Sequence, residues 1–318
     1  MKGKINLKIS VKVPATTANL GPGFDCFGMA LTLYNKITLE ELVYPDKGLE
    51  INIMHGEQEN ETSLLTIPTD KTNVVYKAVE LLYNYVGQTP PDLRINIHAD
   101  IPVAKGLGSS ASVIVGGILA ANKLLGNPAD EAALLSIANE LEGHPDNTTP
   151  AIVGGFCISS AEEDGSVIYK KIEWPEDWKI IVCMPDYELA TQISRSVLPE
   201  NVSMADAIFN LKRSAMFIDA LHTHDAELMR YALRDKLHHP YRSRLIPGFM
   251  EIREDLAEIP TVIGTVISGA GPSIIVIYEN NNFDEINKRI NTVWEALGVK
   301  VTVKKLNIDT KGAVILSQ

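Results

Sequence analysis

Cysteine is scarce in this chain of 318 residues, which holds only Cys26, Cys157 and Cys183. The three are odd in number and widely spaced, so they offer neither a disulfide framework nor the C-x-x-C spacing of a zinc site. This scarcity excludes a small disulfide-held scaffold and predicts a reducing, cytoplasmic location.

Positive charge is in deficit, because 29 Lys and Arg residues face 40 Asp and Glu residues, for a net charge of −11. A general nucleic-acid binder normally carries a basic face, so this balance predicts no nucleic-acid partner. It leaves open a local basic site for an anionic ligand.

Signals for a membrane or for export are lacking as well. The N-terminus alternates polar and apolar residues and has no apolar signal core. The uncharged stretch Gly106–Asn122 covers 17 residues, but its three serines and four glycines make it too short and too polar for a membrane span. The sequence therefore predicts no membrane partner.

The composition, with 45% hydrophobic and 22% charged residues, is that of an ordinary globular protein, and the length predicts two domains. We place them at residues 1–167 and 168–318, because acidic residues and glycine at Ala161–Ser166 indicate a hairpin turn or a boundary.

Strand patterns with interspersed helices, often in hairpin order, predict an α+β fold. The expected strands are Lys4–Val13, Leu31–Val43, Leu93–Ala99, Ala151–Ser159, Trp178–Pro185, Val262–Ser268, Ser273–Tyr278 and Val299–Leu306. The expected helices are Asn73–Val86, Ser109–Leu125, Asp130–Leu141, Met204–His222, Asp225–Arg234, Pro247–Glu258 and Asn282–Leu297, and Pro14–Gly28 is expected to be a polar loop.

The sharpest local signal is the glycine-rich stretch Pro102–Ser112, PVAKGLGSSAS. Gly106 and Gly108 can adopt conformations closed to other residues and let a ligand approach the main chain. Ser109 can cap the apolar helix that follows. A buried helix that begins at such a loop presents free N–H groups and a partial positive charge, which suits a phosphate group.

Three interpretations of this stretch compete. It can be an ordinary loop before a capped core helix. It can be a dinucleotide site, because Gly106-x-Gly108-x-x-Ala111 fits the G-x-G-x-x-G/A pattern and Asp130 lies about 20 residues further on, although Asp100–Lys105 separates the strand from the first glycine. It can also be a nucleotide-phosphate loop of a non-Walker kind, since no G-x-x-x-x-G-K-[ST] occurs in the chain.

A family resemblance favours the third interpretation. Pro102-x-x-x-Gly106-Leu107-Gly108-Ser109-Ser110-Ala111 resembles the phosphate loop of the galacto-, homoserine, mevalonate and phosphomevalonate kinase superfamily. The segment Pro14–Asp25, PATTANLGPGFD, resembles the N-terminal signature of the homoserine kinase family within it, and Ser268–Ser273, SGAGPS, is similar to the superfamily's C-terminal glycine motif. Together with His144-Pro145-Asp146-Asn147, the N-terminal segment narrows the resemblance to homoserine kinases.

The resemblance implies a first domain like ribosomal protein S5 domain 2 and a second, ferredoxin-like domain. It also implies ATP-dependent phosphorylation of the side-chain hydroxyl of L-homoserine to O-phospho-L-homoserine in threonine biosynthesis, with Mg²⁺, in a homodimer. Two alternatives stay open: another small-alcohol kinase of the superfamily, and a nicotinamide-dependent oxidoreductase built on Gly106–Ala111.

The resemblance also implies site residues. For ATP these are Asn73, Pro102, Val103, Ala104, Lys105, Gly106, Leu107, Gly108, Ser109, Ser110, Ala111 and Ser112. The expected metal ligands are Ser110 and Glu140, which with Asn147 form the expected catalytic set. The expected homoserine contacts are Asn19, Asp25, His144, Asn147, Thr191, Arg195, Arg242 and Gly269.

Chemistry supports these roles but does not require them. An arginine fork suits a carboxylate and an aspartate can pair with an ammonium, whereas Asn147 can only donate or accept a hydrogen bond and cannot act as a base. Each residue also has a plainer interpretation: Asn19 and Asp25 as turn formers, Asn73 as a helix cap, and the others as solvated side chains. For Arg242 that plainer interpretation is a solvated basic cluster with His238, His239 and Arg244.

Overall fold

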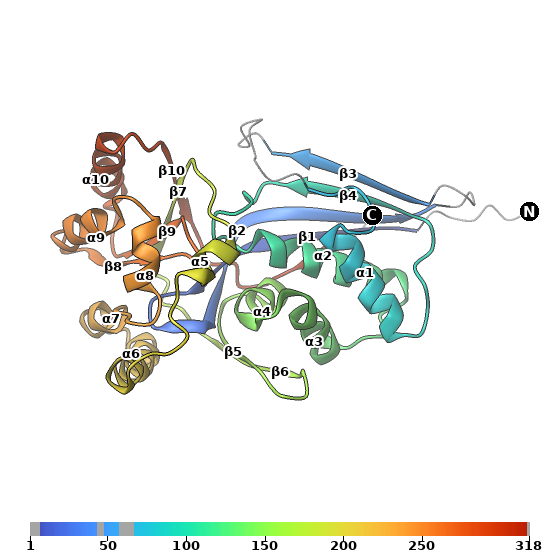
Figure 1. The fold of residues 1–318 in the computed structure, drawn as a ribbon, viewed down its shortest axis with the longest axis horizontal. Coiled ribbons are helices and arrows are strands. Elements are labelled where there is room, and N and C mark those ends of the chain that lie inside the picture. Colours follow the sequence, from blue (N-terminus) through green and yellow to red (C-terminus); the bar gives the residue numbers. More distant parts are fainter. Residues whose placement is uncertain (1–6, 43–47, 57–66, 317–318) are drawn as a thin grey trace, which may run out of the picture.

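The computed structural model describes residues 7–42, 48–56 and 67–316, which form two β-sheets with flanking helices (Figure 1). The start of the expected strand Lys4–Val13 and the end of Leu31–Val43 lie outside the described residues. Among the helices within those ranges, none is long and apolar enough to cross a membrane.

The first sheet has seven strands and is antiparallel throughout, except that its third and fourth strands run parallel. Its main path runs in the order β11-β1-β2-β4-β3, and the hairpin of β5 and β6 continues from β2. The strands are β1 (Lys8–Asn19), β2 (Gly23–Glu41), β3 (Leu49–His55), β4 (Leu93–Ala99), β5 (Phe156–Ala161), β6 (Val167–Ile172) and β11 (Val314–Leu316).

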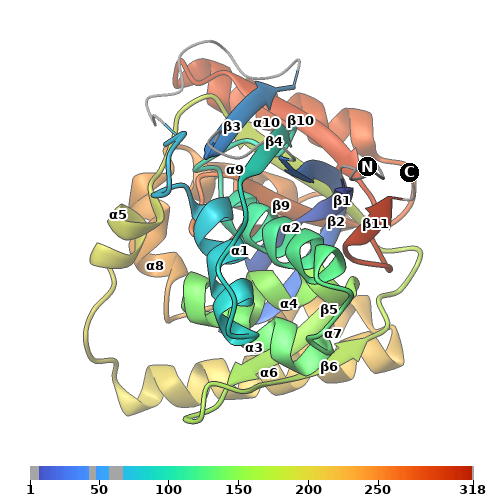
Figure 2. The ribbon, with the colours of Figure 1, turned by 90° about the vertical axis from the view of Figure 1, so that its right-hand side faces the viewer.

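Four helices cover one side of this sheet (Figures 1 and 2). They are α1 (Val74–Tyr85), α2 (Ser109–Leu124), α3 (Glu131–Glu142) and α4 (Pro145–Val153). The apolar residues of α2 explain its central place, because Ile114, Val115 and Ile118 are fully buried against the strands. The phosphate-loop candidate therefore opens a helix that the core holds rigidly.

The second sheet has four antiparallel strands in the order β10-β7-β9-β8. Numbered along the chain, this is the order 4-1-3-2 of a β-α-β-β-α-β unit, so the ferredoxin-like expectation is confirmed. Its strands are β7 (Lys179–Pro185), β8 (Val262–Ile267), β9 (Ile274–Tyr278) and β10 (Val301–Leu306). Its helical elements are α5 (Thr191–Ser196), α6 (Met204–Thr223), α7 (Ala226–Ala232), α8 (His239–Arg242), the 3₁₀ turn η1 (Ser243–Leu245), α9 (Phe249–Ala257) and α10 (Phe283–Ala296).

One hydrophobic cluster at the junction contains residues of both domains. One face of the second sheet packs on α9 and α10, whereas the other face packs on α6, α7 and the strands of the first sheet. At this junction Phe217 of α6 lies 5.0 Å from Phe27 and 5.4 Å from Phe156, measured between ring centroids. The domains are therefore joined by buried aromatic contacts and not only by a linker.

Three expectations about the elements differ from what the structure shows. The boundary between residues 167 and 168 cuts the β5–β6 hairpin, since β6 pairs with β5 through Ile172 and the first sheet continues to that residue. The expected loop Pro14–Gly28 is instead a hairpin, in which the β1 half pairs with β2 and is almost fully buried. The expected strand Ala151–Ser159 begins at Phe156, because α4, which has Pro145 in its first turn, continues to Val153.

Candidate active site

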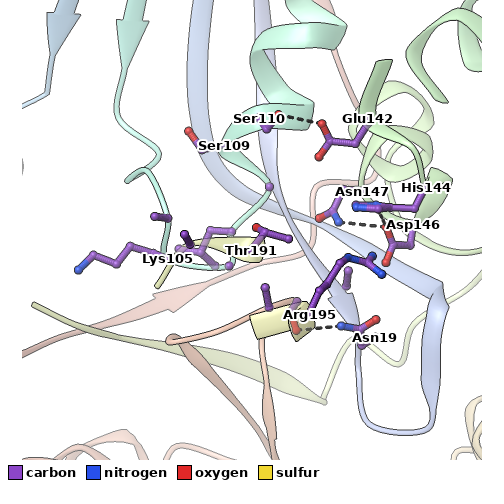
Figure 3. Close-up of a pocket in the computed structure, with 18 of the residues that line it drawn as sticks. Asn19, Lys105, Ser109, Ser110, Glu142, His144, Asp146, Asn147, Thr191 and Arg195 are labelled. Atoms are coloured by element: carbon purple, nitrogen blue, oxygen red, sulfur yellow. Dashed lines mark hydrogen bonds and ion pairs between the residues drawn. The ribbon is translucent and has the colours of Figure 1, made fainter. Parts of the chain in front are cut away.

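The three sequence motifs meet at one place. Thr16 N–H donates to Leu107 O at 3.1 Å, and Gly269 N–H donates to Ala18 O at 3.1 Å. Ser273 N–H donates to Lys105 O at 3.2 Å. These backbone bonds join the N-terminal signature, the glycine-rich stretch and the C-terminal glycine motif around a cavity of about 270 Å³ (Figure 3).

The glycine-rich stretch forms a tight loop at the start of α2. Gly106 has φ 73° and Gly108 has φ 64°, the left-handed region that favours glycine. A Cβ at Gly106 would collide with Ser268 O, and one at Gly108 with the Thr16 hydroxyl. Gly108 is the N-cap and offers no side chain to the first amides of α2. Among the described residues these amides have no capping side chain, and free amides at a helix start are the arrangement that binds phosphate.

Four of the expected ATP contacts do not face the cavity through their side chains. Lys105 donates to Pro185 O at 2.7 Å and Tyr187 O at 2.6 Å, so its ammonium anchors the loop to the second domain (Figure 3). Ala111 and Ser112 are fully buried beneath the loop, where Ser112 Oγ donates to Ser109 O at 2.7 Å. Asn73 caps α1: its Oδ1 accepts from Val75 N at 2.9 Å and its Nδ2 donates to Pro68 O at 2.6 Å, which uses both ends of its amide.

The expected metal ligand Glu140 does not lie at the cavity. Glu140 is exposed on α3 and does not line the cavity, whereas Glu142 does, with its Oε2 2.8 Å from Ser110 Oγ. Residues two apart on a helix point in nearly opposite directions, so only one of the two can face the loop. Burial raises the pKa of Glu142, which the hydrogen bond from Ser110 partly offsets.

The Ser110–Glu142 pair fits a magnesium ion that arrives with a nucleotide. Mg²⁺ takes hard oxygen ligands and usually binds through one or two protein groups together with substrate phosphates and water. A hydroxyl and a carboxylate in hydrogen-bond contact at the phosphate loop supply such a pair. Within the described ranges, no cluster of three or more His, Cys, Asp or Glu could hold a metal without a substrate.

A second polar group occupies the start of α4. Thr16 Oγ1 donates to Asn147 Oδ1 at 2.8 Å, and Asn147 Nδ2 donates to Asp146 Oδ1 at 3.1 Å. The same Asp146 oxygen lies 2.8 Å from His144 Nδ1. Burial lowers the pKa of His144, but the Asp146 carboxylate outweighs burial and the net pKa is raised. The network fixes the orientation of the Asn147 amide at the cavity wall.

Opposite charges line the far wall. Arg195 on α5 binds Asp25 in a bidentate pair, with Nη2 to Oδ1 at 2.8 Å and Nη1 to Oδ2 at 3.0 Å. Asn19 holds Asp25 in place by accepting its N–H at 3.0 Å and itself donates to Gly269 O at 2.8 Å. Arg195 is therefore not a free surface charge, and it forms a charge pair that remains partly open to the cavity.

Arg242 is 1% exposed, which contradicts a solvated basic cluster. Its Nη1 donates to Gly269 O at 2.9 Å and its Nε to Ser194 O at 3.3 Å, and it stacks near the Phe24 ring at 5.2 Å. Burial, and next Arg195, lower its pKa to about 10. Arg242 thus supports the cavity wall from within while still lining it.

The turn between β1 and β2, residues 20–23, is held by the second domain. Asn210 and Ser214 on α6 donate to Pro22 O at 3.3 and 3.1 Å, and His238 Nε2 donates to Gly21 O at 2.8 Å. Asp235 orders these groups: its buried carboxylate accepts from Asn210 Nδ2 at 2.7 Å and from the backbone N–H of His238 at 2.9 Å. The second domain therefore positions the turn that connects Asn19 to Asp25.

The sequence did not identify several of these groups. Glu142, Asp146, Thr16 and Asp235 were absent from the expected set, although the first three lie next to or within the quoted motifs. The sequence could have favoured Glu142 over Glu140 only if the face of α3 that packs beside the start of α2 had been known. For Asp235 the sequence carries no local signal.

Comparison with known proteins agrees with this geometry. The family description GHMP kinases N terminal domain matches residues 73–155, and GHMP kinases C terminal matches residues 217–296. A homoserine kinase of Microchaete diplosiphon is 41% identical over 310 residues and covers 98% of each chain. The chain belongs to the homoserine kinase family.

Two further homoserine kinases are similar to this protein over nearly its whole length. A homoserine kinase of Trichormus variabilis is 42% identical over 305 residues, which cover 96% of this chain and 98% of that relative. The crystal structure of homoserine kinase from Cytophaga hutchinsonii aligns with a TM-score of 0.86 at 26% identity over 99% of both chains. The two-domain α+β expectation is confirmed, and the dinucleotide alternative fails because the glycine loop follows β4 in a mainly antiparallel sheet.

Proposed function

We propose that this protein transfers the γ-phosphoryl group of ATP to the side-chain hydroxyl of L-homoserine, yielding O-phospho-L-homoserine for threonine biosynthesis. One observation carries the proposal: a single cavity joins a phosphate-binding helix start to a paired arginine and aspartate. The names of relatives that are about 40% identical over nearly the whole chain support the same reaction.

In this proposal the loop at Gly106–Ser110 binds the ATP phosphates through backbone amides and serine hydroxyls. Ser110 and Glu142 would hold Mg²⁺, which supplies charge neutralisation of the phosphate oxygens when bound. Glu142 replaces Glu140 in this role because only Glu142 lines the cavity. The remaining nucleotide contacts come from the backbone of 102–108 and not from the ammonium of Lys105.

The far wall suits the zwitterionic end of an amino acid. Arg195 would bind the α-carboxylate and Asp25 the α-ammonium, so the two substrate charges extend the existing ion pair. Arg242, hydrogen-bonded to Gly269 O, also lines this wall. Thr191 lines the cavity from the start of α5. A sugar or another neutral alcohol would leave both protein charges without new partners.

Asn147 would orient the reacting hydroxyl. One of its two amide protons is bound to Asp146, so the other is free to donate to the hydroxyl oxygen of homoserine. Because an amide cannot accept a proton at neutral pH, the hydroxyl proton would leave to a phosphoryl oxygen. Orientation and electrostatic stabilisation then carry the rate enhancement.

The proposed function is tested by measuring ADP release with homoserine, mevalonate, galactose and shikimate. We expect turnover with L-homoserine and at most slow turnover with the others. Turnover of mevalonate or galactose at the rate of homoserine would contradict the amino-acid assignment.

Arg195→Lys tests the carboxylate contact, because lysine keeps the charge but loses the two-pronged donor. A lost charge-assisted hydrogen bond is worth about 1.5–3 kcal/mol, so we expect kcat/KM for homoserine to fall roughly 10- to 100-fold. L-Homoserinol, which lacks the carboxylate, should be a poor substrate and lose little further. Arg244→Lys, an exposed arginine outside the cavity, is the matched control. Equal losses for both substrates would show that Arg195 acts elsewhere.

We further propose a cytoplasmic homodimer that binds neither nucleic acid nor membrane. The three cysteines are free thiols, two of them buried, which suits a reducing compartment. The family resemblance is the support for the dimer. Sedimentation equilibrium at micromolar concentration should give twice the chain mass of 34.8 kDa.

A further inference from the structure

A second cavity lies in the second domain and shares no lining residue with the first. It has a volume of about 530 Å³ and opens between α7, α9 and the edge strand β8, which Figure 1 shows together at the far end from α1. Arg230, Arg234 and Arg253 line it, together with Glu227, Glu254 and Thr265. Nothing in the proposed reaction uses this space.

The three arginines differ in how they are satisfied. Arg230 is committed to the main chain, because its Nε donates to Val262 O at 3.2 Å and its Nη2 to Pro260 O. Arg234 is exposed and lies 5.4 Å from the Tyr231 ring centroid. Arg253 is partly buried, and no hydrogen bond or ion pair joins it to any residue in the described ranges, although the carboxylates of Asp235 and Glu254 attract it from nearby.

A partly buried guanidinium without an ion pair is costly unless something compensates its charge. Burial lowers the pKa of Arg253 and the neighbouring Arg234 lowers it further, whereas the carboxylates of Asp235 and Glu254 offset only part of this. Glu227 and Glu254 line the same cavity, but among the described residues neither makes an ion pair with Arg253. Three guanidinium groups against two carboxylates leave the cavity with a positive balance.

Further hydrogen-bonding groups lie on the cavity floor. The buried hydroxyl of Thr265 has no hydrogen-bond partner among the residues that the structure describes. Ser268 N–H points to β9, where it donates to Ser273 O, and Ile267 N–H points outward to His239 Nε2. Because the direction alternates along a strand, Thr265 N–H also points outward from the sheet edge, and it is unpaired within the part of the chain that the structure describes.

We propose that this cavity is a second ligand site, which binds a small oxyanion, a carboxylate or a phosphate, between Arg234 and Arg253 above Thr265. Guanidinium groups match such oxygens in geometry and charge. The ligand compensates the charge of Arg253 and brings an acceptor to the donors of Arg253 and Thr265.

The site is connected to the turn at residues 20–23. Leu233, which lines the cavity, lies so close to Gly21 that a Cβ there would approach Leu233 O to 2.7 Å. The next residues, Arg234 and Asp235, lead directly to the groups that hold Pro22 and Gly21. An occupied site therefore changes the apparent KM for homoserine, a consequence that rests on the proposed function.

Binding is tested by titration calorimetry with inorganic phosphate and, separately, with acetate. The protein is first saturated with Mg²⁺, the non-hydrolysable ATP analogue AMP-PNP and L-homoserine, so that the first cavity is filled. We expect saturable binding of at least one anion. Arg253→Gln should weaken it roughly 10- to 100-fold, whereas Lys288→Gln, an exposed lysine on α10, should leave it within about twofold.

Thermal unfolding supplies a second readout. The bound anion should raise the midpoint of the wild type and not that of Arg253→Gln. Without anion, the variant should be at least as stable as the wild type, since it removes a partly buried charge that the nearby carboxylates compensate only in part. No saturable binding of either anion, or equal affinity in wild type and Arg253→Gln, would overturn the site.

A separate measurement tests whether the bound anion affects the KM for homoserine. Phosphate or acetate at saturation should shift the apparent KM for homoserine at least twofold in the wild type and leave Arg253→Gln unshifted. Anion binding with an unchanged KM would overturn the coupling but not the site. Absence of homoserine turnover would overturn the proposed function and leave the calorimetric result intact.

Discussion

The buried carboxylate of Glu142 lowers the free energy of unfolding at neutral pH but is placed to bind a cation at the phosphate loop. Its carboxylate is held at the phosphate loop by Ser110, and burial raises its pKa. The folded state therefore binds the proton more tightly than the unfolded state, and the free energy of unfolding falls as pH rises through the raised pKa. At neutral pH the ionised carboxylate is a cost that a bound cation offsets.

Glu142→Gln should lower kcat by roughly 100-fold or more, because several kcal/mol of charge stabilisation depends on this ligand. Glu140→Gln removes the same charge from the exposed side of the same helix and should leave kcat within about twofold. Steady-state assays at saturating Mg²⁺, ATP and homoserine compare the two variants. A large loss in Glu140→Gln, with little in Glu142→Gln, would restore the original assignment.

Glu142→Gln should also stabilise the protein without ligands, by an amount that depends on pH. Without Mg²⁺ and nucleotide, the unfolding midpoint of Glu142→Gln should exceed that of the wild type at pH 7.5 and approach it at pH 5, where Glu142 is closer to being protonated. Each kcal/mol corresponds to about 2–4 °C for a chain of this size. Calorimetry at both pH values measures the difference in unfolding midpoint between the variant and the wild type. A difference that is smaller at pH 7.5 than at pH 5 would contradict the raised pKa of Glu142.

At the scale of elements, the glycine loop and the helix after it could be predicted from the sequence, because Gly106, Gly108 and the apolar run that follows are local signals. The hairpin at Pro14–Gly28 could not, since its small and polar residues are strand-forming only when α4 packs on them. Gly28 illustrates the reason: a Cβ there would collide with Asp146 O of α4, and no local pattern reports that approach.

The same limit applies to the site. Asn19, Asp25 and Arg195 were found through the resemblance, but their mutual pairing depends on how α5 meets the β1–β2 turn. Glu142 was missed because the phase of α3 relative to α2 is a tertiary property. Asp235 lies more than 200 residues from the turn it supports, so only the fold brings them together.

The turn at residues 20–23 gives a prediction about Asp235. Asp235→Asn keeps the shape but replaces one accepting oxygen with a donor amide, which faces the N–H groups of His238 and His239. We expect KM for homoserine to rise about tenfold or more, with KM for ATP within about twofold, because a positioning contact worth on the order of 1.5–3 kcal/mol is lost. Asp255→Asn, in a partly exposed pair with Arg289, is the control. Equal changes in both KM values would indicate general loosening of the fold.

At the scale of the whole molecule, the hydrophobic cluster at the domain junction predicts that the two domains unfold as one cooperative unit. Phe217→Ala should destabilise the protein by about 3–5 kcal/mol, since the ring is fully buried among aromatic rings from both domains. Unfolding followed by tryptophan fluorescence and by far-ultraviolet circular dichroism should give coincident single transitions in wild type and variant. Two separated transitions in the wild type would mean that the domains unfold independently.

The strand β11 has a consequence for the order in which the protein can be made. It pairs with β1, so the sheet that starts near residue 8 is completed only by residues 314–316. A ribosome adds about 5–20 residues each second, so after β6 is synthesised the first sheet waits roughly 7–30 seconds for its last strand. During that interval β1 is an open sheet edge that can pair with other chains. A chain stalled before Val314 would therefore be a substrate for chaperones, even though every residue of its phosphate loop had already been synthesised.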